Sequence, residues 1–171
     1  MKKKSADYIG DALVLSLVLI ILDLIGGFAH LRFEAWFKWL PGIILIIAVT
    51  YYCFQYGKKQ TQGVTFGNVF GYGMKLTSIV AIITVIFTLI SIFLIFPELK
   101  DQFIEKARTD MEAKGGYSEE MIDKGVEMTR KFFLPFAVIG AIVGTYIFGV
   151  IGSLLGAAFT KKTDPDVFQE K

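Results

Sequence analysis

Residues Leu76–Phe96 read LTSIVAIITVIFTLISIFLIF, an apolar run without a charged side chain. Three further apolar runs lie at Ala12–Phe28, Trp39–Tyr56 and Phe132–Phe159. Crossing a hydrocarbon core of about 30 Å takes roughly 20 helical residues. Because lipid offers the backbone no hydrogen bonds, each run has to satisfy its own backbone groups as a helix. The runs therefore predict an all-α integral membrane bundle of four transmembrane helices.

The composition agrees with this fold class. The chain has 171 residues, 54% of them hydrophobic, and a mean hydropathy of +0.56. A soluble fold of this length does not hide that much apolar surface. We expect a single domain over residues 1–171, because no connection is long enough for a separate catalytic domain. The spans are expected at about 8–29, 36–56, 69–96 and 132–159.

The connection 97–131 has its own pattern. Apolar residues recur every fourth position at Leu99, Phe103, Ala107 and Met111, with Lys and Glu between them. Gly115-Gly116 then interrupts the pattern, and the Ser118-Glu119-Glu120 sequence is typical of a helix N-terminus. The sequence predicts an amphipathic helical hairpin between the third and fourth spans. It leaves open whether this hairpin lies on the membrane surface or docks a partner.

The distribution of Lys and Arg sets the expected orientation. Compact basic clusters stand at Lys2–Lys4, Lys58-Lys59 and Lys161-Lys162, whereas the long connection mixes nine acidic with seven basic residues. The cytoplasmic side is the basic one. We expect both termini in the cytoplasm and the long connection in the periplasm, although Arg130-Lys131 beside the fourth span argues for the reverse.

The N-terminus loosely imitates a secretory signal peptide, because basic residues precede an apolar run. Asp7 and Asp11 stand before that run, however, and Asp23 interrupts it. We expect a retained first span.

Three ionisable residues at membrane depth are candidate functional groups: Asp11, Asp23 and Lys75. Asp11 and Lys75 lie near the same end of the first and third spans and form an ion pair if those helices are neighbours. Asp23 lies about 18 Å further along its helix and is too far to join them. It is either a proton or cation site or a structural polar contact near the interface.

Glycines are spaced at intervals that place them on one helix face. Candidate packing positions are Gly67, Gly71, Gly140, Gly144, Gly152 and Gly156, and Gly63 extends the first series. Small residues let helix backbones approach closely in lipid. The partner helix belongs either to the same chain or to another. We expect Gly144→Leu and Gly152→Leu to disturb this face, and Ile142→Leu to leave it intact.

Other chemistry finds no support in the sequence. His30 is the single histidine, and no cluster has the spacing of metal ligands. Cys53 has no partner in the chain and is expected to be a small buried apolar side chain. No nucleophile–base pair, phosphate loop or basic aromatic surface is present. We expect no enzyme activity, no cofactor, no metal and no nucleic acid partner.

A resemblance rests on soft motifs spread over the whole chain. They are GVTFGNVFGYG at Gly63–Gly73, Phe96-Pro97-Glu98, GGYSEE at Gly115–Glu120 and the glycine-rich last run that ends at Lys161-Lys162. With these the chain resembles an uncharacterised bacterial family of small four-span inner-membrane proteins, a domain of unknown function. The resemblance implies four helices in a bacterial inner membrane and transfers no catalytic or binding residue.

Two functional hypotheses follow. The first is a structural or accessory membrane component that acts through helix packing, with itself as a homo-oligomer or with another inner-membrane protein of an envelope complex. Its basis is the glycine series, the amphipathic connection and the lack of catalytic groups. The second is a small-solute or proton-coupled transporter, or an oligomeric pore, that uses Asp23. The lipid bilayer is the partner common to both.

Overall fold

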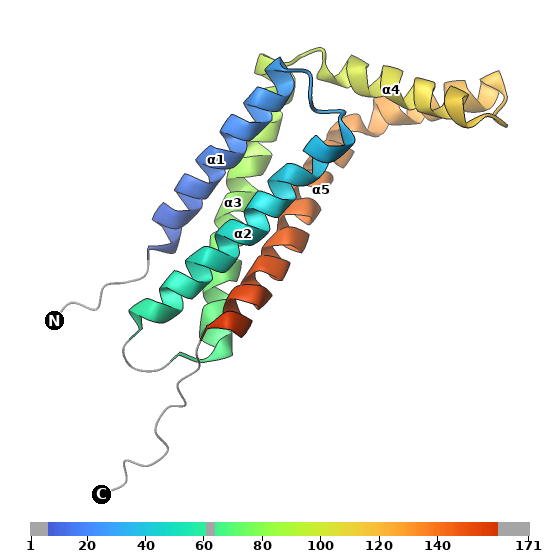
Figure 1. Ribbon diagram of the computed structural model, residues 1–171. Helices are drawn as coiled ribbons and strands as arrows, with labels where there is room; N and C mark the ends of the chain where they lie inside the picture. Colours follow the sequence, from blue (N-terminus) through green and yellow to red (C-terminus); the bar gives the residue numbers. More distant parts are fainter. Residues whose placement is uncertain (1–6, 61–63, 161–171) are drawn as a thin grey trace, which may run out of the picture. The chain divides into compact units, whose positions relative to one another are not determined.

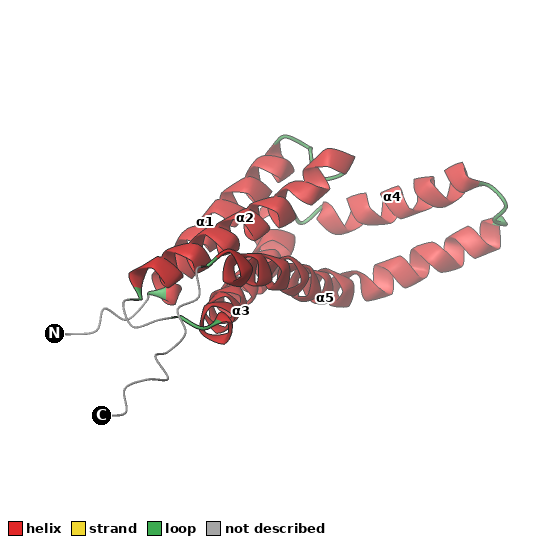
Figure 2. Cartoon of the chain, turned by 60° about the horizontal axis from the view of Figure 1, so that its bottom comes forward, coloured by secondary structure: helices red, strands yellow, loops and turns green. Residues whose placement is uncertain are grey.

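The computed structural model describes residues 7–60 and 64–160. The described residues contain five α-helices and a single turn of π-helix, and they include no strand. The elements are α1 (Tyr8–Phe28), α2 (Ala35–Lys59), α3 (Phe66–Ile90), η1 (Ser91–Ile95), α4 (Leu99–Lys114) and α5 (Glu119–Phe159). The fold is all-α, as predicted (Figures 1 and 2).

Among the described residues, four helices are long and apolar enough to cross a membrane: α1, α2, α3 with η1, and α5. Each predicted span falls on one of them. Four such helices indicate a multi-pass membrane protein. α5 is the longest at 41 residues, about 60 Å of helix and roughly twice the depth of a hydrocarbon core.

Two compact units divide the chain. Unit 1 comprises Met1–Thr84 and Ile142–Lys171, and unit 2 comprises Val85–Ala141. The single domain expected for residues 1–171 stays a prediction.

Unit 1 joins α1, α2, the first part of α3 and the last part of α5 side by side (Figure 1). Successive helices run in opposite directions, so the start of α1 lies at the same end as the end of α2 and the start of α3. The core is formed by small and branched side chains, among them Leu45, Val49, Val69, Leu76 and Val80. Large apolar side chains also cover the outside of these helices, where a lipid environment accepts them.

The turn after α1 explains how the chain enters α2. The N–H of Leu31 donates to the carbonyl of Gly26 at 2.9 Å, and His30 has a φ of 55°. This is the left-handed closing turn in which glycine is the usual residue. Beside the turn, Gly26 has no side chain where the ring of Phe37 lies, so the start of α2 packs closely against the end of α1.

Unit 2 contains the end of α3, η1, α4 and the first part of α5. η1 closes with a bond from the N–H of Phe96 to the carbonyl of Ser91 at 2.8 Å. α4 then ends at the predicted break, where Gly115 and Gly116 have φ values of 66° and 81°. Ser118 precedes α5 and its Oγ accepts from the N–H of Met121 at 3.4 Å, which satisfies one open donor of the helix start.

α4 and the start of α5 contact each other within unit 2. The rings of Phe103 and Phe133 lie 5.5 Å apart, and Arg108 contacts Asp123 at 3.5 Å. Their outer faces carry pairs one helical turn apart: Lys106 with Asp110, Arg108 with Glu112 and Lys124 with Glu120. Such exposed pairs stabilise a helix only slightly. Glu112 also raises the pKa of the Arg108 guanidinium above its usual value, through a hydrogen bond to the charged form.

Candidate functional site

A polar cluster lies where α1 begins, α2 ends and α3 begins. It consists of Tyr8, Asp11, Tyr56 and Tyr72, and we call it the tyrosine–aspartate cluster. The hydroxyl of Tyr72 donates to Oδ2 of Asp11. The ring of Tyr56 stacks on that of Tyr72, with centroids 4.4 Å apart and planes 5° apart. Tyr8 meets the same ring edge-on at 6.4 Å. Tyr72 is buried, so these contacts join three helices at one point.

The start of α1 places Asp11 in this cluster. Asp7 caps the helix, and its Oδ1 accepts from the N–H of Gly10 at 2.9 Å. Asp11 follows one turn later, on the face that also carries the buried Leu15. Negative charge in the first turn is favourable beside the free N–H groups of a helix start. Helix geometry and capping therefore both support a carboxylate here.

Lys75 does not form the expected ion pair. The ion pairs of the described residues do not include Lys75 with Asp11. Its ammonium lies 6.0 Å from the centroid of the Tyr8 ring, at the outer limit of a cation–π contact. α1 and α3 are neighbours, as the expectation required, but the neutral Tyr72 takes the place at Asp11 that was assigned to Lys75.

Asp23 is paired at the other end of α1. Its Oδ2 lies 2.6 Å from a guanidinium nitrogen of Arg32, whose side chain is only 13% exposed. The same guanidinium reaches the carbonyl of Asp23 at 3.5 Å. The arginine stands just beyond the turn at His30 and folds back onto the helix. Of the two expectations for Asp23, this geometry matches the structural contact, and it supplies a partner that sequence reasoning had missed.

The predicted packing glycines divide into two groups. Gly152 and Gly156 lie against α2: a Cβ on Gly152 would stand 2.9 Å from the carbonyl oxygen of Ile46, and one on Gly156 would stand 3.1 Å from that of Thr50. The hydroxyl of Thr50 also donates to the carbonyl of Gly152 at 3.1 Å. These glycines bring the two backbones together within the chain.

The other group faces open space. Among the described residues, a Cβ added to Gly71, Gly140 or Gly144 would meet no neighbouring helix or side chain within 4 Å, and one on Gly67 would meet only the hydroxyl of Thr65, at 4.0 Å. Gly63 lies outside the described residues. Close packing inside the described chain therefore explains only two of the six predicted positions.

Gly73 and Gly149 are among the glycines outside the six candidate packing positions that also make close contacts. A Cβ on Gly73 would stand 2.7 Å from Sγ of Cys53, and one on Gly149 would stand 2.5 Å from Oγ1 of Thr77. Both lie beside the predicted series rather than in it. The sequence places Gly149 in a second row of small residues on α5, with Ala141, Thr145, Ser153 and Ala157, and Ser153 and Ala157 of that row are also buried.

Cys53 is fully buried, as predicted, and its Sγ lies 3.7 Å from the carbonyl oxygen of Val69. Two buried hydroxyls, on Ser16 and Thr77, have no hydrogen-bond partner among the described residues. No group of three or more His, Cys, Asp or Glu side chains that could hold a metal is found in the described part of the chain.

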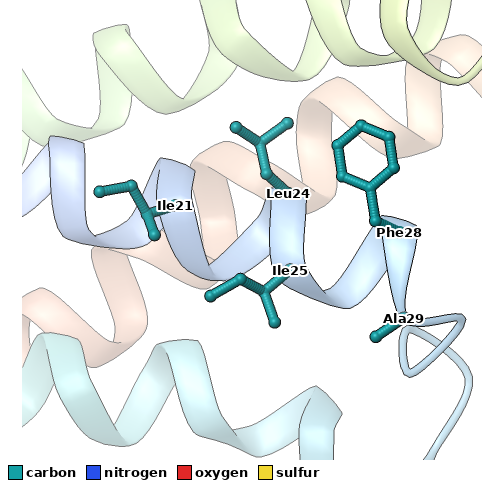
Figure 3. Close-up of a pocket in the computed structure, with 5 residues that line it drawn as sticks. All are labelled: Ile21, Leu24, Ile25, Phe28 and Ala29. Atoms are coloured by element: carbon teal, nitrogen blue, oxygen red, sulfur yellow. The ribbon is translucent and has the colours of Figure 1, made fainter.

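An apolar hollow of about 440 Å³ lies along the second half of α1. Ile21, Leu24, Ile25, Phe28 and Ala29 line it (Figure 3). Its walls offer no acid, base or nucleophile. The hollow therefore suits hydrocarbon and has no catalytic groups.

The model of a family described as "Protein of unknown function (DUF4199)" matches residues 8–162. The chain belongs to this family. The resemblance to a family of unknown function is thus confirmed over nearly the whole chain. No curated protein and no solved structure matches the chain, so the family adds no activity, substrate or partner.

Proposed function

We propose that the chain is a structural or accessory membrane protein that acts through packing of α5 against a second copy of itself. The observation that carries this is the division of the glycines on α5. Gly152 and Gly156 lie against α2, whereas a Cβ added to Gly140 or Gly144 would meet no neighbouring helix or side chain of the described residues within 4 Å. A glycine in a helix costs about 1 kcal/mol relative to alanine in water. An unoccupied pair suggests a contact outside the chain.

The spacing of the open pair supports a second copy as the occupant. Gly140 and Gly144 form a Gly-x-x-x-Gly pattern. In this pattern the two glycines leave a groove on the helix, and the backbones of two identical transmembrane helices can contact each other there. The apolar window of α5 is also the least covered of the four, with 11% of it buried against 22–28% for the other helices. Another inner-membrane protein of an envelope complex is the alternative occupant of the same face.

Transport through Asp23 has less support. A carboxylate that binds and releases a proton or a cation during transport needs an oxygen atom that is not already paired with a positively charged side chain. Asp23 is paired with Arg32 at 2.6 Å.

The size of the purified particle tests the proposal. The chain has a mass of 19.1 kDa. Native mass spectrometry of the protein released from mild detergent is expected to show a dimer. A particle that is strictly monomeric over the accessible concentration range would contradict the proposal, and a stoichiometric complex with a different membrane protein would favour the alternative occupant.

The finer architecture belongs to the same proposal. α4 and the start of α5 form an amphipathic hairpin on the periplasmic surface of a bacterial inner membrane, with both termini cytoplasmic. The contacts of Phe103 with Phe133 and of Arg108 with Asp123 support the hairpin, and Lys58-Lys59 at the end of α2 supports the orientation. The basic clusters at Lys2–Lys4 and Lys161-Lys162 lie outside the described residues.

Labelling of a cysteine at the tip of this hairpin tests the orientation. Lys114 is exposed and ends α4, and the native Cys53 is 0% exposed and gives little background. Lys114→Cys is expected to react with an impermeant maleimide in cells whose outer membrane has been removed. Reaction only after lysis would reverse the orientation. Cys53 alone, in the unchanged chain, is the control.

A further inference from the structure

Among the residues that the structure describes, the carboxylate of Asp11 has no positively charged partner. Its hydrogen-bond donor is the neutral hydroxyl of Tyr72, and the ion pairs of the described residues do not include it. A carboxylate near the membrane interface is costly when its charge is not compensated. It also has several lone pairs, so the bond from Tyr72 leaves room for a second donor. The carboxylate of Asp11 can therefore bind a cation that also donates a hydrogen bond.

The rings around Asp11 favour an ammonium in particular. Tyr8, Tyr56 and Tyr72 come from three helices and meet at one point. Aromatic faces attract ammonium groups through the ring quadrupole. The ammonium of Lys75 lies 6.0 Å from the centre of the Tyr8 ring, at the outer limit of such a contact, so the ring can still take a closer ammonium.

Lys75 adds the opposite charge beside the tyrosine–aspartate cluster. It is exposed, and it stands one turn after Tyr72 on α3. Its ammonium is not held by a carboxylate of the described residues and remains available to a phosphate. Asp11 and Lys75 thus offer one negative and one positive group beside the ring of Tyr8.

We propose that Asp11, Lys75 and Tyr8 bind the zwitterionic headgroup of a phospholipid. Its ammonium lies against Asp11 and the ring of Tyr8, and its phosphate lies against Lys75. The neighbouring residues of α1 support a lipid rather than a free amine. Val14 and Val18 lie about one and two turns after Asp11 on the same side of α1 and are 56% and 44% exposed, so acyl chains have apolar surface beside the headgroup. This site does not depend on the association proposed for α5.

Lipid retention by the full chain tests the site. The purified protein is exchanged into nanodiscs that contain equal amounts of phosphatidylethanolamine and phosphatidylglycerol, and the retained lipid is counted by native mass spectrometry. Phosphatidylethanolamine is expected to be retained over phosphatidylglycerol by about tenfold, because only the former has an ammonium for Asp11 and Tyr8. Asp11→Asn is expected to abolish this preference, and Lys75→Gln to weaken retention of both lipids.

Two more variants keep the test decisive. Tyr8→Leu leaves both charges in place and is expected to reduce the preference several-fold, which covers the case in which Asp11→Asn does not fold. Tyr51→Phe is the matched control, because Tyr51 is an exposed tyrosine bonded to Gln55 outside the cluster. Equal retention of the two lipids by the unchanged chain, or an undiminished preference in folded Asp11→Asn, would overturn the proposal. Free ethanolamine that displaces the lipid at matched concentration would overturn the assignment to a lipid.

Discussion

Two stretches of α5 carry glycines at the same spacing and have different surroundings. Gly152 and Gly156 lie against the backbone of α2, at Ile46 and Thr50, where an added Cβ would stand 2.9 Å and 3.1 Å from carbonyl oxygens. A Cβ added to Gly140 or Gly144, by contrast, would meet no neighbouring helix or side chain in the described part of the chain within 4 Å. Spacing alone therefore identifies which residues share a helix face, but it does not reveal which partner covers that face. The first pair brings α5 against α2, and we propose that the second pair joins two molecules.

The largest expected effect is at the occupied pair. Gly152→Leu places a branched side chain against the carbonyl of Ile46, and backbone gives way less easily than a side chain. We expect a loss of at least about 3 kcal/mol in the free energy of unfolding, or no folded protein. Unfolding in a denaturing detergent, followed by circular dichroism, measures it. Stability within about 1 kcal/mol of the unchanged chain would contradict the close contact with α2.

A pair of glycines on α3 extends the comparison to a second helix. Gly71 has open space around it, whereas a Cβ on Gly73 would stand 2.7 Å from Sγ of the buried Cys53. Gly73→Ala is expected to destabilise the fold by about 1–3 kcal/mol through overpacking. Gly71→Ala, two residues away, is expected to be neutral or to stabilise by up to about 1 kcal/mol through helix propensity. Equal effects of the two changes would show that the difference in surroundings is not real.

A smaller effect is expected where a side chain can be trimmed to make room. A Cβ on Gly149 would meet the side chain of Thr77, 2.5 Å from its Oγ1. Gly149→Ala alone is expected to cost about 1–2 kcal/mol. Because the clash is with Thr77, the double variant Gly149→Ala/Thr77→Ala is expected to be more stable than the sum of its single effects by about 0.5–1.5 kcal/mol. If the two single changes in the free energy of unfolding simply add, Gly149 and Thr77 are not in contact.

The sequence predicts the helices well because their signal is local. A run such as Leu76–Phe96 satisfies its own backbone in lipid whatever lies beside it, and Gly115-Gly116 ends α4 through its own dihedral freedom. Contacts between helices depend on rotation about each axis, which the sequence does not state. For this reason the spans fall on the observed helices, whereas the partner of each glycine could not be predicted.

The two aspartates of α1 show the same limit. Counting residues along the helix correctly separated Asp11 from Asp23. It also placed Asp11 at the same depth as the start of α3. It did not identify Tyr72 as the donor to Asp11, because tyrosines near span ends are ordinarily interface residues. Nor did it find Arg32, which reaches Asp23 only because the chain turns sharply at His30. Residue spacing along a helix cannot predict a contact that depends on a turn after the helix.

The open pair on α5 is tested most directly by association in a bilayer. Donor- and acceptor-labelled chains in liposomes are expected to show energy transfer that falls as lipid dilutes the protein. Gly144→Leu is expected to weaken this association at least about tenfold, or about 1.4 kcal/mol, with thermal stability unchanged. Ile142→Leu, at a position that is 38% exposed on the same helix, is the matched control and should associate like the unchanged chain. Association of Gly144→Leu that equals that of the unchanged chain, or no association in any of them, would contradict the account.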